Sequence, residues 1–263
     1  LREKGLKNEI KSDNTPVTNG DIEVNNILTK KISSITPEIP IISEETSSNK
    51  KDKNLENFWL IDPIDGTGSY INNKDEFTLN AALIINKKPL SGIINAPGKN
   101  RLFYSYGPLN SFEVIDGKEI NLSKKKKNKS NEIKAISYSN EIKNEILKFH
   151  NKFKVNSYQK MKSSLKFCVI AAGEYDLYIA DPRAYEWDIA AGHAILEHSG
   201  GTLTDFNGNK ILYGKEDFKN PSLIAKGRIF YDKWAIKINI DNCFICFNFW
   251  FCSIYFCKKL YQE

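Results

Sequence analysis

Two aspartates stand three positions apart at the end of an apolar run. In "FWLIDPIDGT", residues 58–67, Asp62 and Asp65 flank Pro63 and Ile64. Burying two carboxylates together is unfavourable unless a cation lies between them. Because Pro63 keeps the backbone out of a helix, both carboxylates and the Ile64 carbonyl can point at one spot. Hard oxygen ligands of this kind suit Mg²⁺.

The two residues after the second aspartate add a phosphate-binding feature. Gly66 and Thr67 offer backbone N–H groups at the start of a helix or turn, where an anion binds favourably. The stretch therefore predicts metal-assisted chemistry on a phosphate. An Asp-Pro/Asp-Gly turn with ordinary capping is the alternative.

Other acidic residues follow apolar segments elsewhere in the chain. Glu44 and Glu45 end a short apolar strand, Asp188 lies in the first turn of a helix, and Asp21 begins another helix. Each has an ordinary interpretation alone, as a solvated strand end, a partner of the helix dipole or a helix cap. Their occurrence together with the aspartate pair favours one acidic site assembled from distant segments.

Several motifs taken together resemble a known family. "DNTPVTNGD", "PIISEE", "WLIDPIDGT", "EFTLNAALI" and "EWDIAAGHAILEHSGG" are similar to the inositol monophosphatase superfamily of Mg²⁺-dependent, lithium-sensitive phosphatases. Its signatures are W-x-x-D-P-x-D-G-T and a later W-D-x-A-A-G. The resemblance spans roughly residues 8 to 225 and looks closest to the 3′(2′),5′-bisphosphate nucleotidase branch, which serves sulfur assimilation.

The resemblance implies a fold, a reaction and a set of site residues. The fold is a layered α/β/α/β/α sandwich, and the substrate is a small phosphorylated nucleotide, adenosine 3′,5′-bisphosphate, hydrolysed to AMP and phosphate, with its 5′-phosphosulfate analogue as a further candidate. Two or three Mg²⁺ ions would be held by Glu44, Asp62, the Ile64 carbonyl, Asp65 and Asp188. Asp21 and Thr67 would orient and activate the attacking water. Substrate contacts would come from Ile64, Asp65, Gly66, Thr67, Ser164, Lys166 and Asp188.

The sequence departs from that branch around the substrate pocket. Gly68 follows D-G-T where Lys is usual, Lys162 replaces a Gly, and "ADPRAYE" precedes Trp187. The metal ligands survive, so hydrolysis is expected to survive as well. Lys166 and Arg183 are candidates to meet a second phosphate, with simple solvation as the alternative.

Hydrophobic periodicity divides the chain into three parts. Residues 1–130 predict a helix from Asp21 followed by a mostly antiparallel sheet with strands at 37–45, 57–61, 77–85, 89–95, 101–106 and 111–122, and a turn at 62–67. Residues 131–230 predict an α/β half with strands at 132–139 and 175–180 and helices at 140–150, 163–173 and 186–201. Residues 231–263 form an aromatic and Cys-rich tail.

Composition indicates a soluble globular protein. Of its 263 residues, 41% are hydrophobic and 27% charged, and the net charge is +6. The residue usage, skewed to Lys, Asn, Ile, Phe and Tyr with their A/T-rich codons, indicates an A/T-rich genome, and a bacterial source is expected. The lysines are spread along the chain without interleaved aromatics, which argues against nucleic-acid binding. No signal peptide opens the chain, so a cytoplasmic location is expected, with contact at the inner membrane only through the tail. The tail has three interpretations: an artefact of the sequence, a membrane-surface anchor, or a packed segment. The oligomeric state is not fixed.

Two other functions remain open at this stage. An inositol or other sugar-phosphate monophosphatase would use the same metal centre. A truncated, non-catalytic relative would bind ligand weakly or not at all, although an intact set of costly clustered carboxylates argues against it.

Overall fold

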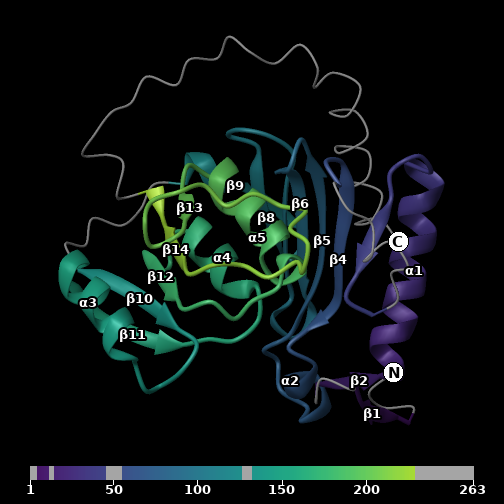
Figure 1. Ribbon diagram of the computed structural model, residues 1–263, viewed down its shortest axis with the longest axis horizontal. Helices are drawn as coiled ribbons and strands as arrows, with labels where there is room; N and C mark the ends of the chain where they lie inside the picture. The colour runs from purple at the N-terminus through teal and green to yellow at the C-terminus, as the bar shows by residue number, and fades with distance from the viewer. Residues whose placement is uncertain (1–4, 12–14, 46–54, 126–131, 229–263) are drawn as a thin grey trace.

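The computed structural model describes residues 5–11, 15–45, 55–125 and 132–228. Helices and sheets alternate in five layers (Figure 1). From one side to the other these are helix α1, a seven-stranded sheet, helices α4 and α5, a five-stranded sheet, and helix α3. The tail predicted from residue 231 and most of the lysine-rich 124–129 stretch lie outside the described residues. Within those residues, no helix is both long enough and apolar enough to cross a membrane.

The seven-stranded sheet carries the first half of the chain. β3 runs parallel to β4, and each later neighbour is antiparallel. Two-residue turns at Asn86–Lys87 and Asp116–Gly117, all with positive φ, close two of its hairpins. In order, the strands are β3 (Ile41–Ser43), β4 (Phe58–Asp65), β5 (Thr78–Ile85), β6 (Lys88–Ala96), β7 (Arg101–Ser105), β8 (Ser111–Ile115) and β9 (Lys118–Asn121); 3₁₀ turns η3 (Pro97–Lys99) and η4 (Leu122–Lys124) follow β6 and β9.

Helix α1 (Asn19–Ile35) covers part of one face of this sheet. Its start is fixed by a capping box in which Thr18 and Asp21 exchange hydrogen bonds. Ile32 is fully buried and packs with Trp59 and other residues of β4 and β5. A short ribbon, β1 (Asn8–Ile10) and β2 (Pro16–Thr18), leads into α1, and the short helix α2 (Thr67–Ile71) follows β4.

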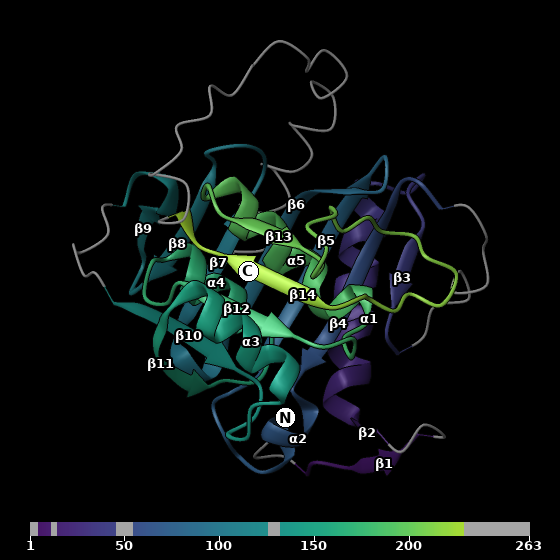
Figure 2. The same cartoon turned by 60° about the vertical axis from the view of Figure 1, so that its left-hand side comes forward.

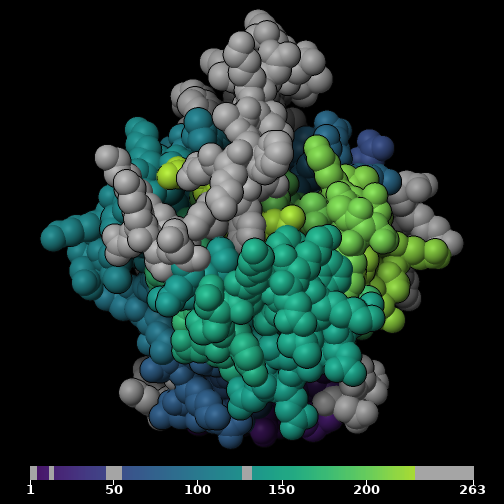
Figure 3. All heavy atoms as spheres, turned by 90° about the vertical axis from the view of Figure 1, so that its left-hand side faces the viewer, coloured from purple at the N-terminus to yellow at the C-terminus, as the bar shows by residue number. Residues whose placement is uncertain are grey.

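The five-stranded sheet has the order β11-β10-β12-β14-β13. Its bounds are β10 (Ile133–Ser137), β11 (Val155–Lys160), β12 (Leu177–Ala180), β13 (Thr202–Thr204) and β14 (Leu223–Lys226). β10 is parallel to both β11 and β12, so the carboxyl ends of these three strands share one edge of the sheet. Helix α3 (Asn144–Phe153) covers the outer face, as Figures 2 and 3 show.

Helices α4 (Leu165–Ala171) and α5 (Glu186–His198) lie between the two sheets and form the main core with both. α5 is buried along most of its length because apolar residues surround it on every side. Gly192 makes this packing close: a Cβ there would lie 2.5 Å from the Phe167 ring of α4.

Three local expectations were wrong. The 62–67 segment is not wholly a turn, because β4 continues to Asp65 through a bulge. The helix expected from residue 140 begins at Asn144 and ends at Phe153. Strand β11 was not foreseen, because "VNSYQK" is an exposed edge strand that lacks an apolar run.

Candidate active site

The acidic residues singled out from the sequence lie together in space. Glu44 follows β3, Asp62 lies within β4, and Asp188 lies in the first turn of α5. One carboxylate oxygen from each lies within 4.8 Å of the others. Asp65, at the end of β4, lies close enough to act electrostatically on all three. These four residues are called the acidic cluster below.

The acidic cluster concentrates negative charge away from water. Asp62 is 1% exposed, and its Oδ1 has no hydrogen-bond partner among the described residues. Burial, followed by repulsion from Glu44, Asp65 and Asp188, raises the pKa of Asp62 well above its ordinary value. Burial and the same kind of repulsion raise the pKa of Asp188 as well. A buried carboxylate oxygen with an open lone pair beside two further carboxylates suits a divalent cation.

A β-bulge in β4 orients the side chains of Asp62 and Asp65 toward the same site. Asp62 pairs with Asn80 and Asp65 pairs with Thr78, so three steps along β4 match two along β5. The extra residue breaks the alternation of side chains, which lets both aspartates serve one site. The Ile64 carbonyl is freed from the ladder and lies 3.0 Å from the Thr67 hydroxyl.

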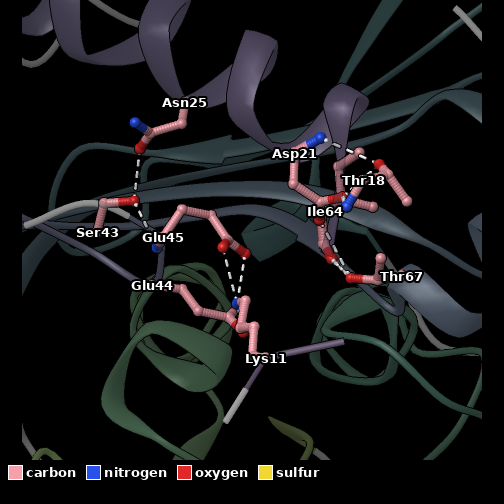
Figure 4. Close-up of polar contacts among 9 residues, drawn as sticks. All are labelled: Lys11, Thr18, Asp21, Asn25, Ser43, Glu44, Glu45, Ile64 and Thr67. Atoms are coloured by element: carbon pink, nitrogen blue, oxygen red, sulfur yellow. Dashed lines mark hydrogen bonds and ion pairs between the residues drawn. The ribbon is translucent and has the colours of Figure 1, made fainter. Parts of the chain in front are cut away.

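Thr67 and Asp21 meet beside this carbonyl (Figure 4). The Thr67 Oγ1 lies 3.1 Å from Asp21 Oδ1, so its single hydrogen can be donated to Asp21 or to the Ile64 carbonyl. The other Asp21 oxygen accepts from the Thr18 backbone N–H at 2.8 Å and from its hydroxyl at 2.5 Å. Asp21 is fully buried. A carboxylate held this firmly can orient the threonine hydroxyl and, through it, a water molecule.

Gly66 makes the turn into α2. Its φ is +94°, and a Cβ there would lie 2.8 Å from the Glu76 carbonyl oxygen. Only glycine fits this position without strain. The turn places the first backbone N–H groups of α2 immediately after the aspartate pair.

Lys11 also contributes to the site, although sequence reasoning did not predict it. Its amine lies 3.2 Å from Glu44 and 2.7 Å from Glu45. Burial lowers the pKa of Lys11, but the two glutamates outweigh burial and the net direction is upward. Lys11 therefore stays charged and partly neutralises the acidic cluster. It lies in a polar stretch on the edge of the β1–β2 ribbon, where no periodicity or motif marks it.

The second half of the chain is tied to the cluster through Ser164. Its Oγ lies 2.5 Å from Asp65 Oδ2 and 2.5 Å from the Asp188 carbonyl oxygen, and it accepts from the Asn80 side-chain amide at 2.9 Å. Lys166 is buried nearby, and its amine donates to the Ser163 carbonyl at 2.6 Å. Burial lowers the pKa of Lys166, while Asp65 and Asp188 oppose that shift.

The chain matches the model of the inositol monophosphatase family over residues 1–238. The 3′(2′),5′-bisphosphate nucleotidase CysQ of Buchnera aphidicola is 38% identical over 214 residues, which are 80% of this chain and 79% of that protein. The protein of the same name from Escherichia coli K12 is 32% identical over 213 residues, 80% of this chain and 85% of the relative.

Solved structures show the same fold. The crystal structure of CysQ from Bacteroides thetaiotaomicron, a bacterial member of the inositol monophosphatase family, has a TM-score of 0.63 at 28% identity and covers 76% of this chain and 82% of its own. A Thermotoga maritima IMPase has a TM-score of 0.66 at 24% identity, with coverage of 86% and 85%. The layered α/β fold expected from the sequence is therefore confirmed.

Proposed function

Because the chain belongs to the inositol monophosphatase family, we propose that it is a Mg²⁺-dependent 3′(2′),5′-bisphosphate nucleotidase that converts adenosine 3′,5′-bisphosphate to AMP and phosphate. Family membership confirms the resemblance and the prediction of a phosphatase. The metal and the nucleotide substrate are our proposal. The observation that carries it is the convergence of Glu44, Asp62 and Asp188, whose oxygens lie within 4.8 Å of one another.

The donor set fits Mg²⁺. It offers carboxylates from β4, the end of β3 and the start of α5, together with the bulge carbonyl of Ile64, and all of these are hard oxygen ligands. When bound, Mg²⁺ supplies a lowered pKa for water and neutralises charge on the phosphate oxygens. Asp62, whose buried Oδ1 has no hydrogen-bond partner in the described part of the chain, is the residue that most needs such an ion.

The protein's own residues prepare the attack. Asp21 holds the Thr67 hydroxyl in place, and Thr67 in turn can accept a hydrogen bond from a water molecule and fix its direction. We place the transferred phosphoryl group at the start of α2, where the first backbone N–H groups of the helix would favour its negative charge. Asp65, held by Ser164, couples this arrangement to the second half of the chain.

The substrate assignment is supported by the relatives named as bisphosphate nucleotidases, which are 30% identical or more over about four-fifths of this chain. We extend the proposal to the 5′-phosphosulfate analogue, which carries the same 3′-phosphate, and to inhibition by Li⁺. An inositol or sugar-phosphate monophosphatase is the competing activity, because the metal centre would be the same.

Phosphate release from purified protein tests the proposal. Adenosine 3′,5′-bisphosphate, its 5′-phosphosulfate analogue and inositol 1-phosphate are compared with and without Mg²⁺ and Li⁺. We expect Mg²⁺-dependent release from the bisphosphate at the highest kcat/KM, and loss of turnover in Asp65→Asn. Faster release from inositol 1-phosphate would favour the competing activity. No release from any substrate, with no Mg²⁺ binding by calorimetry, would identify a non-catalytic relative.

A further inference from the structure

Strand β5 changes from apolar to polar where it pairs with the two aspartates of β4; the two strands lie side by side (Figure 1). On one face of β5, Ala82 belongs to the main core between the sheets, but the next two positions on that face are Asn80 and Thr78. Asn80 pairs with Asp62 across the ladder, and Thr78 pairs with Asp65. Because cross-strand partners project on the same face of a sheet, the polar part of β5 lies beside the acidic cluster.

Asn80 contacts the serine that joins the second half of the chain to the cluster. Asn80 and Ser164 are both buried, and the side-chain amide of Asn80 donates to Ser164 Oγ at 2.9 Å. The same oxygen lies 2.5 Å from Asp65 Oδ2 and 2.5 Å from the Asp188 carbonyl oxygen. A hydroxyl offers one hydrogen and two lone pairs. Since Asp65 and the Asp188 carbonyl both present acceptors, the N–H of Asn80 is the group that can bond a lone pair of this hydroxyl.

This contact fixes the orientation of the Asn80 amide. With the amide oxygen toward Ser164, a hydroxyl with a single hydrogen would meet three acceptors. The opposite orientation, with nitrogen toward Ser164, leaves Asn80 Oδ1 buried and without a hydrogen-bond partner among the residues that the structure describes. Asp62, the cross-strand neighbour, has an oxygen in the same condition. The face of the sheet beside the cluster therefore carries open acceptors on both strands.

An open acceptor on Asn80 argues against a purely structural role. Burying an amide oxygen without a partner costs free energy, whereas an apolar side chain of the same shape has no such cost. Ala82, two positions along the same face, shows that this side of β5 otherwise packs with apolar side chains. What Asn80 adds, and an apolar residue could not, is the donor that reaches Ser164.

We propose that Asn80 is a positioning residue of the metal centre, which directs the hydroxyl of Ser164 and, through it, the carboxylate of Asp65. The inference rests on the proposed function and deepens it. Groups that hydrogen-bond to the ligands of a metal ion fix the orientation of those ligands. While Asn80 donates to Ser164, the serine cannot turn away from Asp65 without leaving the buried amide N–H unpaired. Asn80 acts through Ser164 and not on the phosphate.

Asn80→Leu tests the role, because leucine nearly preserves the shape of the side chain and removes the amide. Calorimetry with Mg²⁺ alone measures the ligands without any substrate, and we expect the dissociation constant to rise about 5- to 20-fold. With adenosine 3′,5′-bisphosphate at saturating Mg²⁺, kcat should fall about 10-fold and KM should change less than about threefold. Asn95→Leu, the same substitution at an exposed position of the adjacent strand β6, is the matched control and should change none of these quantities.

A double-mutant cycle shows whether Asn80 acts through Ser164. In the Ser164→Ala background no hydroxyl remains to be directed, so adding Asn80→Leu should change Mg²⁺ affinity less than about twofold. Asn80→Ala repeats the cycle with a smaller side chain and should give the same result, because it also removes the donor. Additive losses in the cycle, or unchanged Mg²⁺ affinity and kcat in Asn80→Leu, would overturn the inference. Circular dichroism in EDTA checks that each variant is folded.

Failure of the proposed function gives a different result. The unmodified protein would then bind no Mg²⁺ or release no phosphate from adenosine 3′,5′-bisphosphate. Faster release from inositol 1-phosphate would overturn the substrate assignment and leave the Asn80 test in place, because the calorimetric cycle uses the metal ion alone.

Discussion

Asp62→Asn should stabilise the metal-free protein while abolishing its activity. Asp62 is buried, one of its oxygens has no hydrogen-bond partner among the described residues, and neighbouring carboxylates raise its pKa. Asparagine keeps the shape of the side chain and removes the charge. The variant therefore relieves repulsion within the acidic cluster without opening a cavity.

The distances set the size of the effect. Two unit charges 4.8 Å apart, the largest separation among the ligand oxygens of Glu44, Asp62 and Asp188, repel by about 3.5 kcal/mol at an effective dielectric constant of about 20. Asp62 has two such neighbours, and any shorter separation repels more, so full ionisation would cost at least about 7 kcal/mol at this dielectric constant. Raised pKa values reduce the charge that the cluster carries at a given pH, and Lys11 screens Glu44, so the effect is smaller than for full ionisation. We expect a net gain of about 1–3 kcal/mol in the free energy of unfolding.

Thermal unfolding in EDTA and in excess Mg²⁺ provides the assay. For a chain of this size, each kcal/mol corresponds to about 2–4 °C in Tm. The variant should melt higher than the unmodified protein in EDTA, and this order should reverse in Mg²⁺, because only the unmodified protein binds the ion tightly. Glu23→Gln, which neutralises an exposed carboxylate on α1, should leave both values unchanged. A variant that melts lower than the unmodified protein in EDTA would refute the view that these carboxylates repel one another without a cation.

Three further outcomes follow from the same geometry. Thr67→Ala should lower kcat about 100-fold or more with little change in KM. Thr67→Ser should keep most activity because it retains the hydroxyl that faces Asp21. Equal losses of kcat in both variants would contradict the positioning role of Thr67. In EDTA, the free energy of unfolding should fall as pH rises from about 4 through the raised pKa values of the buried aspartates. Over this range the folded state loses protons that the unfolded state has already lost. Chemical denaturation at a series of pH values measures this slope, which Mg²⁺ should flatten. Gly192→Ala should destabilise by about 1–3 kcal/mol in urea unfolding, since its new methyl group would lie 2.5 Å from the Phe167 ring, whereas Gly117→Ala, which meets no atom within 4 Å, isolates the cost of positive φ alone.

Local signals in the sequence predicted most elements of the fold. The Asp116–Gly117 pair marked a hairpin turn, and the apolar runs of β5 and β6 marked their strands, because these features depend on neighbours along the chain. The end of β4 was harder to predict. Proline and glycine suggested a turn, but pairing with β5 extends the strand to Asp65 through a bulge, and pairing of this kind is not visible in one strand's own sequence.

The candidate site was predictable in its acidic members but not in their environment. Carboxylates that follow apolar strands or lie in the first turn of a helix can be recognised from the sequence, because burying several of them together is unfavourable without a cation. The Lys11 contact with Glu44 joins residues 33 positions apart, and Lys11 stands in no pattern that separates it from a solvated residue. Ser164 was expected to contact the substrate, but its contact with Asp65, 99 positions away, was not predicted. Arg183 and Lys162 could be named as unusual residues from the sequence, but the Tyr138 ring that joins them required the topology of the parallel strands.

The site depends on the packing of the two sheets against α4 and α5. Asp62 and Asp65 come from the seven-stranded sheet, while Ser164 and Asp188 come from the segments that begin these two helices. The Ser164 hydroxyl lies within hydrogen-bond distance of both the Asp65 carboxylate and the Asp188 carbonyl, to either of which it can donate its single hydrogen, only while the helices hold their present separation from β4. Close packing of Gly192 on the Phe167 ring fixes the separation of α4 from α5, because a dense core has discrete arrangements and does not deform smoothly. We therefore expect metal affinity and core packing to be coupled, so that a change in either one must be measured against the other.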